Sequence, residues 1–203
     1  MTRLQIKSEL TPLTVDISSI MQQTTMTAKQ FYAFCQANRD LRIERTAEGE
    51  VIVMPPAFSD TGNRNFGIAV QLGIWAAKDG TGEGFDSSAG FTLPNGAVRS
   101  PDAAWIKLTR WNTLSETQKA SFAPICPDFV IELRSASDSL TSLQKKMAEY
   151  TENGALLGLL IDRKQRTVSL YRPNALPQVL EHPDSVSCDP ELPEFRLQMS
   201  KIW

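Results

Sequence analysis

Cysteine and histidine are scarce in this chain of 203 residues, and their scarcity excludes several kinds of site. The three cysteines, Cys35, Cys126 and Cys188, lie far apart without a C-x-x-C pair, and His182 is the single histidine. An odd number of isolated cysteines predicts neither a disulfide framework nor a zinc knuckle. One histidine cannot supply a multi-histidine metal site. His182 is followed by a proline, so we expect it to be a loop residue. The reducing cytoplasm is the compartment that this cysteine usage favours.

Long hydrophobic runs and an excess of one charge are also absent. The longest apolar run, 154–161, is far shorter than the ~20 residues of a membrane-spanning helix, and the first residues lack a signal-peptide core. Lysine and arginine number 21 against 23 aspartates and glutamates, so the net charge of −2 gives no general attraction to nucleic acid. We predict a soluble, cytoplasmic protein with no membrane contact, in which any DNA binding depends on a local basic surface.

The composition that remains is typical of a globular domain. Apolar residues make up 41% and charged residues 22% of a length that suits one domain. A capping-box pattern at Thr27 and Gln30 predicts the first helix, and the patterns at 41–45 and 51–54 predict a pair of strands after it.

A second helix is predicted after Pro55-Pro56, with Ser59 or Asp60 as its cap. Its apolar positions keep helical spacing and are Phe66, Val70, Ile74 and Ala77. The glycine-rich stretch 80–84 follows. A phosphate-binding loop should open a helix, whereas this stretch leads into a strand-like segment, so we interpret it as a hairpin turn.

The second half of the chain alternates between strand and helix patterns. Strands are predicted at 98–107, 128–134, 156–162 and 167–171, with a helix at 138–153. This order predicts a mixed α/β or α+β domain. The boundaries that we assign are an N-terminal extension at 1–26, a domain at 27–175, and a proline-rich extended segment at 176–203 that packs on the same domain.

The segment 127–134 predicts a buried strand that contains a carboxylate. Because side chains alternate along a strand, Asp128, Glu132 and Arg134 share one face with Val130. A carboxylate in an apolar run is costly unless a cation compensates for it. A metal ion and Arg134 are the two candidates for that cation.

A second carboxylate, Asp102, enters another apolar strand, where it shares a face with Ala104 and Ile106. Two neighbouring strands that place carboxylates on one face would form an oxygen-rich pocket. Such a pocket suits Mg²⁺, which takes few protein ligands and completes its shell with water and substrate phosphates.

The helix at 138–153 offers a third element. Its apolar stripe consists of Leu140, Leu143, Met147 and Tyr150. On a helical projection Lys146 flanks this stripe and can turn its ammonium back towards the sheet, whereas Lys145 faces solvent.

Each of these residues also has a purely structural interpretation. Asp102 could cap a turn, Glu132 could pair with Arg134, and the aliphatic stem of Lys146 could cover the rim of the core. Spacing alone leaves the metal site and the structural interpretation open.

At these residues the chain resembles a known family. Pro101-Asp102 and Glu132-Leu133-Arg134 resemble the PD-(D/E)XK nuclease signature. More closely, RSPDAAWI, PDFVIELRSASDSL, QKKMAEYTENGALLGLLID and VSLYRP, with LRIERTAEGEVIVMPP before them, are similar to the Uma-type restriction endonuclease family. Most of the chain, from residue 27 to residue 173, takes part in the resemblance.

The resemblance implies a restriction-endonuclease-like core, in which a central mixed β-sheet is flanked by helices. It also implies a Mg²⁺- or Mn²⁺-dependent site for cleaving DNA, and a homodimer. Asp102 and Glu132 match the two acids that would hold the metal. Arg134 stands where the superfamily has its lysine, and Lys146 matches a lysine that this family supplies from the next helix. Glu44 matches a recurrent acid that could assist the site, or it could be an exposed strand residue.

Two functions from different classes remain in competition. Asp102, Glu132 and Lys146 favour a Mg²⁺-dependent DNA endonuclease. Arg134 and the acidic charge balance favour a catalytically inactive nuclease-fold module that binds DNA or a protein. A metal-dependent hydrolase of small phosphoesters fits the same residues, although the family analogy speaks against it. The candidates for DNA contact, for which ordinary surface roles are the simpler interpretation, are Arg64, Arg99, Lys107, Arg110 and Trp111.

Overall fold

The computed structural model describes residues 3–7, 12–16 and 26–203, with side chains described from residue 26 onward. The chain divides into two compact units, one of residues 1–56 with 95–99, the other of residues 57–94 with 100–203. No helix in these described ranges combines the length and the hydropathy needed to cross a bilayer.

The described part of the smaller unit contains five strands, all paired antiparallel, and one helix. In chain order its elements are β1 (Arg3–Lys7), β2 (Pro12–Asp16), α1 (Ala28–Ala37), β3 (Arg42–Arg45), β4 (Val51–Met54) and β7 (Val98–Arg99). β1 pairs with β2, and β3 pairs with both β4 and β7. Thr27 and Gln30 form the reciprocal capping box at the start of α1, so that prediction and the predicted strand pair are confirmed.

The larger unit carries a six-stranded mixed sheet. In chain order its elements are α2 (Ser59–Asp79), β5 (Gly82–Asp86), β6 (Phe91–Thr92), β8 (Ala103–Lys107), α3 (Leu108–Trp111), α4 (Glu116–Lys119), β9 (Phe129–Leu133), α5 (Leu140–Glu152), β10 (Leu157–Asp162), β11 (Thr167–Tyr171), β12 (Gln178–Glu181), β13 (Ser185–Ser187) and β14 (Arg196–Gln198). The strand order is β12-β11-β10-β9-β8-β5, in which β9 and β10 run parallel and the other neighbours antiparallel. The predicted mixed α/β fold is confirmed.

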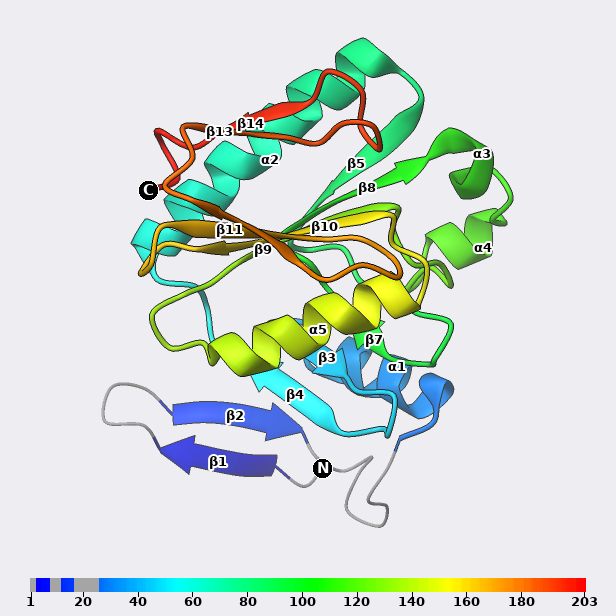
Figure 1. Ribbon diagram of the computed structural model, residues 1–203. Coiled ribbons are helices and arrows are strands. Elements are labelled where there is room, and N and C mark those ends of the chain that lie inside the picture. The colour runs from blue at the N-terminus through cyan, green and yellow to red at the C-terminus, as the bar shows by residue number, and fades with distance from the viewer. Residues whose placement is uncertain (1–2, 8–11, 17–25) are drawn as a thin grey trace. The chain divides into compact units, whose positions relative to one another are not determined.

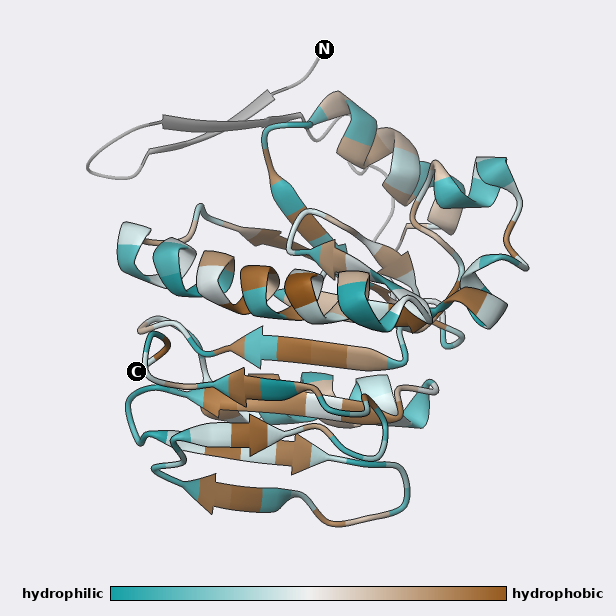
Figure 2. Cartoon of the chain, turned by 90° about the horizontal axis from the view of Figure 1, so that it is seen from above, coloured by the Kyte–Doolittle hydropathy of each residue, from teal (hydrophilic) through white to brown (hydrophobic). Residues whose placement is uncertain are grey.

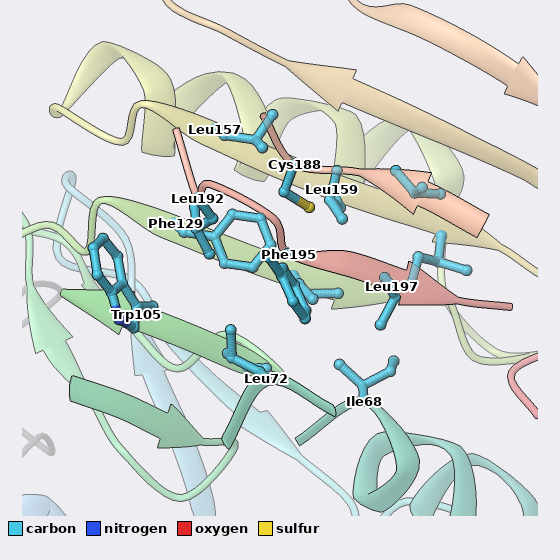
Figure 3. Close-up of a cluster of buried hydrophobic side chains, with 14 of the residues drawn as sticks. Ile68, Leu72, Trp105, Phe129, Leu157, Leu159, Cys188, Leu192, Phe195 and Leu197 are labelled. Atoms are coloured by element: carbon cyan, nitrogen blue, oxygen red, sulfur yellow. The ribbon is translucent and has the colours of Figure 1, made fainter. Parts of the chain in front are cut away.

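Two layers cover the six-stranded sheet. Figure 1 shows α2 and the β13–β14 pair on one face and α5 on the opposite face. The face under α2 holds the main hydrophobic core, where residues of α2 and of the C-terminal segment meet the strands (Figure 3). Trp75 on α2 donates its indole N–H to the Pro193 carbonyl at 2.9 Å, which ties the C-terminal segment to the helix.

The alternation of side chains along β9 separates the core from the opposite face. Phe129, Ile131 and Leu133 all enter the core under α2. Figure 2 shows the same concentration of apolar residues along the strands, in brown. Each such side chain stabilises the fold by about 1.5–3 kcal/mol when it is fully buried. The residues between them, Val130 and Glu132, therefore point to the face covered by α5.

Close contact between α5 and the sheet depends on a glycine. A Cβ atom on Gly158 of β10 would lie 2.4 Å from Cε of Met147 and 3.3 Å from a methyl of Val130. The absent side chain lets α5 approach the strands closely, with Met147 and Tyr150 fully buried beneath it.

The predicted second helix is confirmed as α2, and the apolar positions noted in its sequence lie on its exposed side. Phe66, Val70 and Ile74 are 70%, 40% and 69% exposed, whereas Leu72 and Trp75 are buried. Both faces of α2 carry apolar residues at helical spacing, so spacing could not decide which face meets the sheet. The predicted cap is wrong, because the N-cap residue is Phe58 and makes no side-chain hydrogen bond.

The glycine-rich stretch 80–84 ends a helix and starts a strand; it is not the predicted hairpin turn. Gly80 adopts the left-handed conformation (φ 68°) that closes α2. Gly82 begins the edge strand β5, and a Cβ atom there would lie 2.2 Å from the Trp105 ring. The glycine at 82 thus makes room for a buried indole.

We predict that Gly82→Ala lowers the free energy of unfolding by about 1–3 kcal/mol, because the Trp105 ring or the β8 backbone must move. Gly62→Ala on α2 is the matched control. No atom lies within 4 Å of a Cβ atom at Gly62, and alanine there gains up to about 1 kcal/mol of helix propensity. Urea denaturation measures both values, and equal effects would contradict this account of Gly82.

Candidate active site

The two predicted acids lie at the same end of neighbouring strands. β8 and β9 pair antiparallel, with Ala103 opposite Ile131 and Trp105 opposite Phe129. Continuing this register by one residue places Asp102, in the bend before β8, opposite Glu132. The carboxylates of Asp102 and Glu132 are buried, with 8% and 5% exposure.

Glu132 is held by two residues of α5. The Lys146 ammonium lies 2.8 Å from its Oε1 atom, and the Tyr150 hydroxyl donates to the same oxygen at 3.1 Å. Lys146 and Tyr150 are four residues apart, so they lie one helical turn apart on the same side of α5. The predicted direction of Lys146 is confirmed, and Lys145 is exposed as expected.

Asp102 is held by a backbone amide and by α2. The Leu133 N–H donates to Oδ2 at 2.9 Å, and the Asn65 side-chain amide donates to Oδ1 at 2.9 Å. The predicted face-sharing of Asp102 with Ala104 does not describe this geometry, because Asp102 lies in the bend outside β8, where strand alternation no longer applies. Both carboxylate oxygens are nevertheless fixed beside the end of β9.

Arg134 does not compensate the charge of Glu132. Its guanidinium pairs with Asp162 at 2.6 Å and donates to the Asp138 carbonyl at 3.2 Å. The structural alternative in which Glu132 pairs with Arg134 is therefore wrong. Asp162, only 2% exposed at the end of β10, was not singled out from the sequence. The parallel register of β9 and β10, which puts Glu132 opposite Leu160, carries on to bring Arg134 beside Asp162.

Asp128, the residue before β9, has a structural role and does not take part in the candidate site. Its carboxylate accepts from the Lys107 N–H at 2.9 Å and pairs with Arg110 at 2.9 Å. These contacts tie the start of β9 to the end of β8 and to α3.

Glu44 lies in the smaller unit, where its carboxylate is 2% exposed and pairs with Arg99 at 3.3 Å. The interpretation of Glu44 as an exposed strand residue is therefore wrong. A buried ion pair explains why an acid stands in β3, and assistance to the site stays a prediction.

The arginines considered for DNA contact have partners within the protein. Arg64 pairs with Asp60 and donates to the Ile202 carbonyl, while Arg99 and Arg110 pair with Glu44 and Asp128. Trp111 packs edge-on against Phe85, with ring centroids 5.0 Å apart. These contacts support the simpler structural interpretation of each residue.

The cysteines are unsuited to nucleophilic chemistry. Burial raises the pKa of the Cys126 thiol to about 12 and that of Cys35 to about 11, and it also raises the pKa of Cys188. A thiol must lose its proton to act as a nucleophile, so these three remain inert at neutral pH.

The donor set of Asp102 and Glu132 fits a hard divalent cation. Carboxylate oxygens are the protein ligands that Mg²⁺ prefers, and Mg²⁺ is often bound by one or two of them, with water and phosphate oxygens completing its shell. Among the residues with described side chains, no three or more histidine, cysteine, aspartate or glutamate side chains gather as a metal site. A closed cage built wholly from such side chains is thus not found in this part of the chain.

Comparison with known proteins assigns the family. The sequence model of the Uma2 family, described as "Putative restriction endonuclease", matches residues 28–200. The chain belongs to the Uma2 family. The predicted resemblance is confirmed, and the match includes Asp102, Glu132 and Lys146.

A solved structure shares the fold of this Uma2 protein. It is the crystal structure of a "putative nuclease belonging to DUF820" from Anabaena variabilis, with a TM-score of 0.67 and 22% sequence identity. The similarity covers 79% of this chain and 88% of that one. No curated protein matches the sequence.

We predict that Lys146→Met lowers the free energy of unfolding by about 3–5 kcal/mol, because it leaves the Glu132 carboxylate buried without its ammonium partner. The double variant Glu132→Gln/Lys146→Met should lose less than the sum of the two single variants, since it removes both charges together. Urea denaturation of the four proteins at pH 7 measures this coupling. Strictly additive losses would contradict a direct interaction.

Proposed function

We propose that this Uma2 protein is a Mg²⁺-dependent DNA endonuclease, with Mn²⁺ as a substitute metal. The single observation that carries the proposal is the 2.8 Å contact of Lys146 with Glu132, beside an Asp102 held at the end of the adjacent strand. Membership of a restriction endonuclease family supplies the substrate class.

Asp102 and Glu132 would hold the cation through their carboxylates. A divalent cation at this place offsets the negative charge that develops on the phosphate and lowers the pKa of a bound water. Tyr150 donates to Glu132 and keeps its carboxylate in one orientation. The Leu133 amide does the same for Asp102.

Lys146 would take the role that the superfamily gives to the lysine of its signature. Its side chain is 12% exposed, and its ammonium is close enough to Glu132 to orient a water molecule and to attract the scissile phosphate. Arg134 is engaged with Asp162, and a guanidinium that stays charged is a poor proton acceptor. Both facts support Lys146, and not Arg134, in the role of the signature lysine.

A second candidate function is a catalytically inactive module that binds DNA or a protein. The specific observation in its favour is that Lys146 and Tyr150 both engage one oxygen of Glu132, as in a purely structural buried ion pair. The two functions differ in whether DNA is cut.

The decisive experiment incubates supercoiled and linear DNA with the protein and Mg²⁺, Mn²⁺ or Ca²⁺. We expect metal-dependent cleavage that disappears in Asp102→Asn and Glu132→Gln, and that falls by about 100-fold or more in Lys146→Met. Lys145→Met is the matched control, because it removes the same charge from an exposed neighbour and should leave the rate unchanged. Metal-independent DNA binding without cleavage by the unmodified protein would contradict the endonuclease and favour the module.

We also propose that the protein is a homodimer, with a second copy covering α2. The exposed apolar stripe of α2 (Phe66, Val70 and Ile74) lies beside a groove that α2 forms with the edge strand β5. Small residues, Ala69, Gly73 and Ala77, line the helix side of that groove. Across a twofold axis, the apolar stripe of each copy can pack into the groove of the other.

Charge supports the same arrangement. Two α2 helices that cross antiparallel oppose their helix dipoles, because the positive N-terminal end of each lies near the negative C-terminal end of the other.

We predict that Ile74→Glu converts the dimer to a monomer, because the buried carboxylate would lack a partner. Analytical ultracentrifugation measures the mass. Leu176→Glu is the matched control, since Leu176 is 93% exposed outside the stripe, and that variant should stay dimeric. A monomeric unmodified protein, or a dimeric Ile74→Glu variant, would contradict the proposed interface.

A further inference from the structure

Asn65 on α2 links the candidate site to the helix that covers the opposite face of the sheet from α5. Its Nδ2 atom donates to Oδ1 of Asp102 at 2.9 Å. Figure 1 shows α2 and α5 on the two faces of the sheet. One acid of the site is thus held from α2, and the other, Glu132, is held from α5.

The hydrogen bond to Asp102 fixes the orientation of the Asn65 amide. An ionised carboxylate can only accept hydrogen bonds, so the amide must present its NH₂ group to Asp102 and turn its carbonyl oxygen elsewhere. That oxygen, Oδ1, is buried and has no hydrogen-bond partner in the described part of the protein.

A buried acceptor without a donor is uncommon, because almost all buried polar atoms in proteins are hydrogen-bonded. If Asn65 only filled space against the core, an apolar side chain would serve without this unsatisfied oxygen. A hydrogen-bond donor that arrives with a ligand would satisfy the Oδ1 atom of Asn65. Metal-bound water is such a donor, since Mg²⁺ commonly retains several water molecules in protein sites.

We infer that Asn65 is a positioning residue of the metal site. Its Nδ2 atom orients Asp102, and its Oδ1 atom accepts a hydrogen bond from a water molecule of the divalent cation that Asp102 and Glu132 hold. This inference rests on the proposed function, because it needs a cation at that place. It assigns Asn65 a role in metal affinity, separate from any direct contact with DNA.

The test measures Mn²⁺ binding by electron paramagnetic resonance, together with the thermal stability of the metal-free protein. Asn65→Leu removes both halves of the amide, and we expect Mn²⁺ affinity to fall about 10-fold or more, in the range seen for groups that orient metal ligands. The metal-free variant loses the hydrogen bond to Asp102 together with the unsatisfied oxygen, and its thermal unfolding shows that the affinity is measured on folded protein. Asn63→Leu, an exposed position on the same helix, is the matched control and should leave the affinity unchanged.

A conservative variant provides a second measurement, which also decides the question if Asn65→Leu does not fold. Asn65→Ser keeps a polar side chain that is too short to hold Asp102 and a metal-bound water together, so its Mn²⁺ affinity should also fall about 10-fold. Asn63→Ser makes the same change at the exposed position and should leave the affinity unchanged.

The outcomes separate this inference from the function on which it rests. Failure of the unmodified protein to bind Mn²⁺ would overturn both. Mn²⁺ binding that needs Asp102 and Glu132 but is unaffected by Asn65→Leu or by Asn65→Ser would overturn the role of Asn65 and leave the nuclease proposal intact.

Discussion

The contact between a buried carboxylate and a buried ammonium determines how the larger unit is organised. Glu132 stands in the middle of an apolar sheet, and a charge at that depth is tolerated only with a partner. Lys146 supplies the partner from α5, and Tyr150 adds a hydrogen bond to the same oxygen. The alternation along β9 points Glu132 towards α5, and the close approach of α5 at Gly158 brings Lys146 within reach of its carboxylate.

The site draws on elements from both faces of the sheet. The main core under α2 fixes β9 from one side, and α5 fixes the carboxylate of Glu132 from the other. Asp102 lies where the β8–β9 ladder stops, and its carboxylate replaces the missing backbone partner of the Leu133 amide. The end of the ladder therefore holds one oxygen of the acid through a backbone amide, and Asn65 of α2 sets the direction of its second oxygen.

Local patterns predicted the elements and the direction of Lys146 but not the tertiary pairing. Strand alternation and helical projection are properties of neighbouring residues, so they placed Glu132 and Lys146 correctly. They could not orient α2, because Phe66 and Leu72 stand on two apolar faces of one helix. Asp162 and Asn65 were missed because their roles depend on register and packing between segments about 30 to 40 residues apart. Asp162 had one usable signal, a carboxylate closing the apolar run that ends β10.

The parallel pairing of β9 and β10 has a consequence for where the cation beside Glu132 comes from. Parallel neighbours cannot be joined by a tight hairpin, so the chain must cross over one face of the sheet between them. In this protein the crossover contains α5, and it passes over the face to which Glu132 points. The crossover that parallel pairing requires therefore places a basic residue, Lys146 of α5, beside Glu132. Because Lys146 of the crossover pairs with Glu132, Arg134, two residues further along the strand, is left to pair with Asp162 of the neighbouring strand β10.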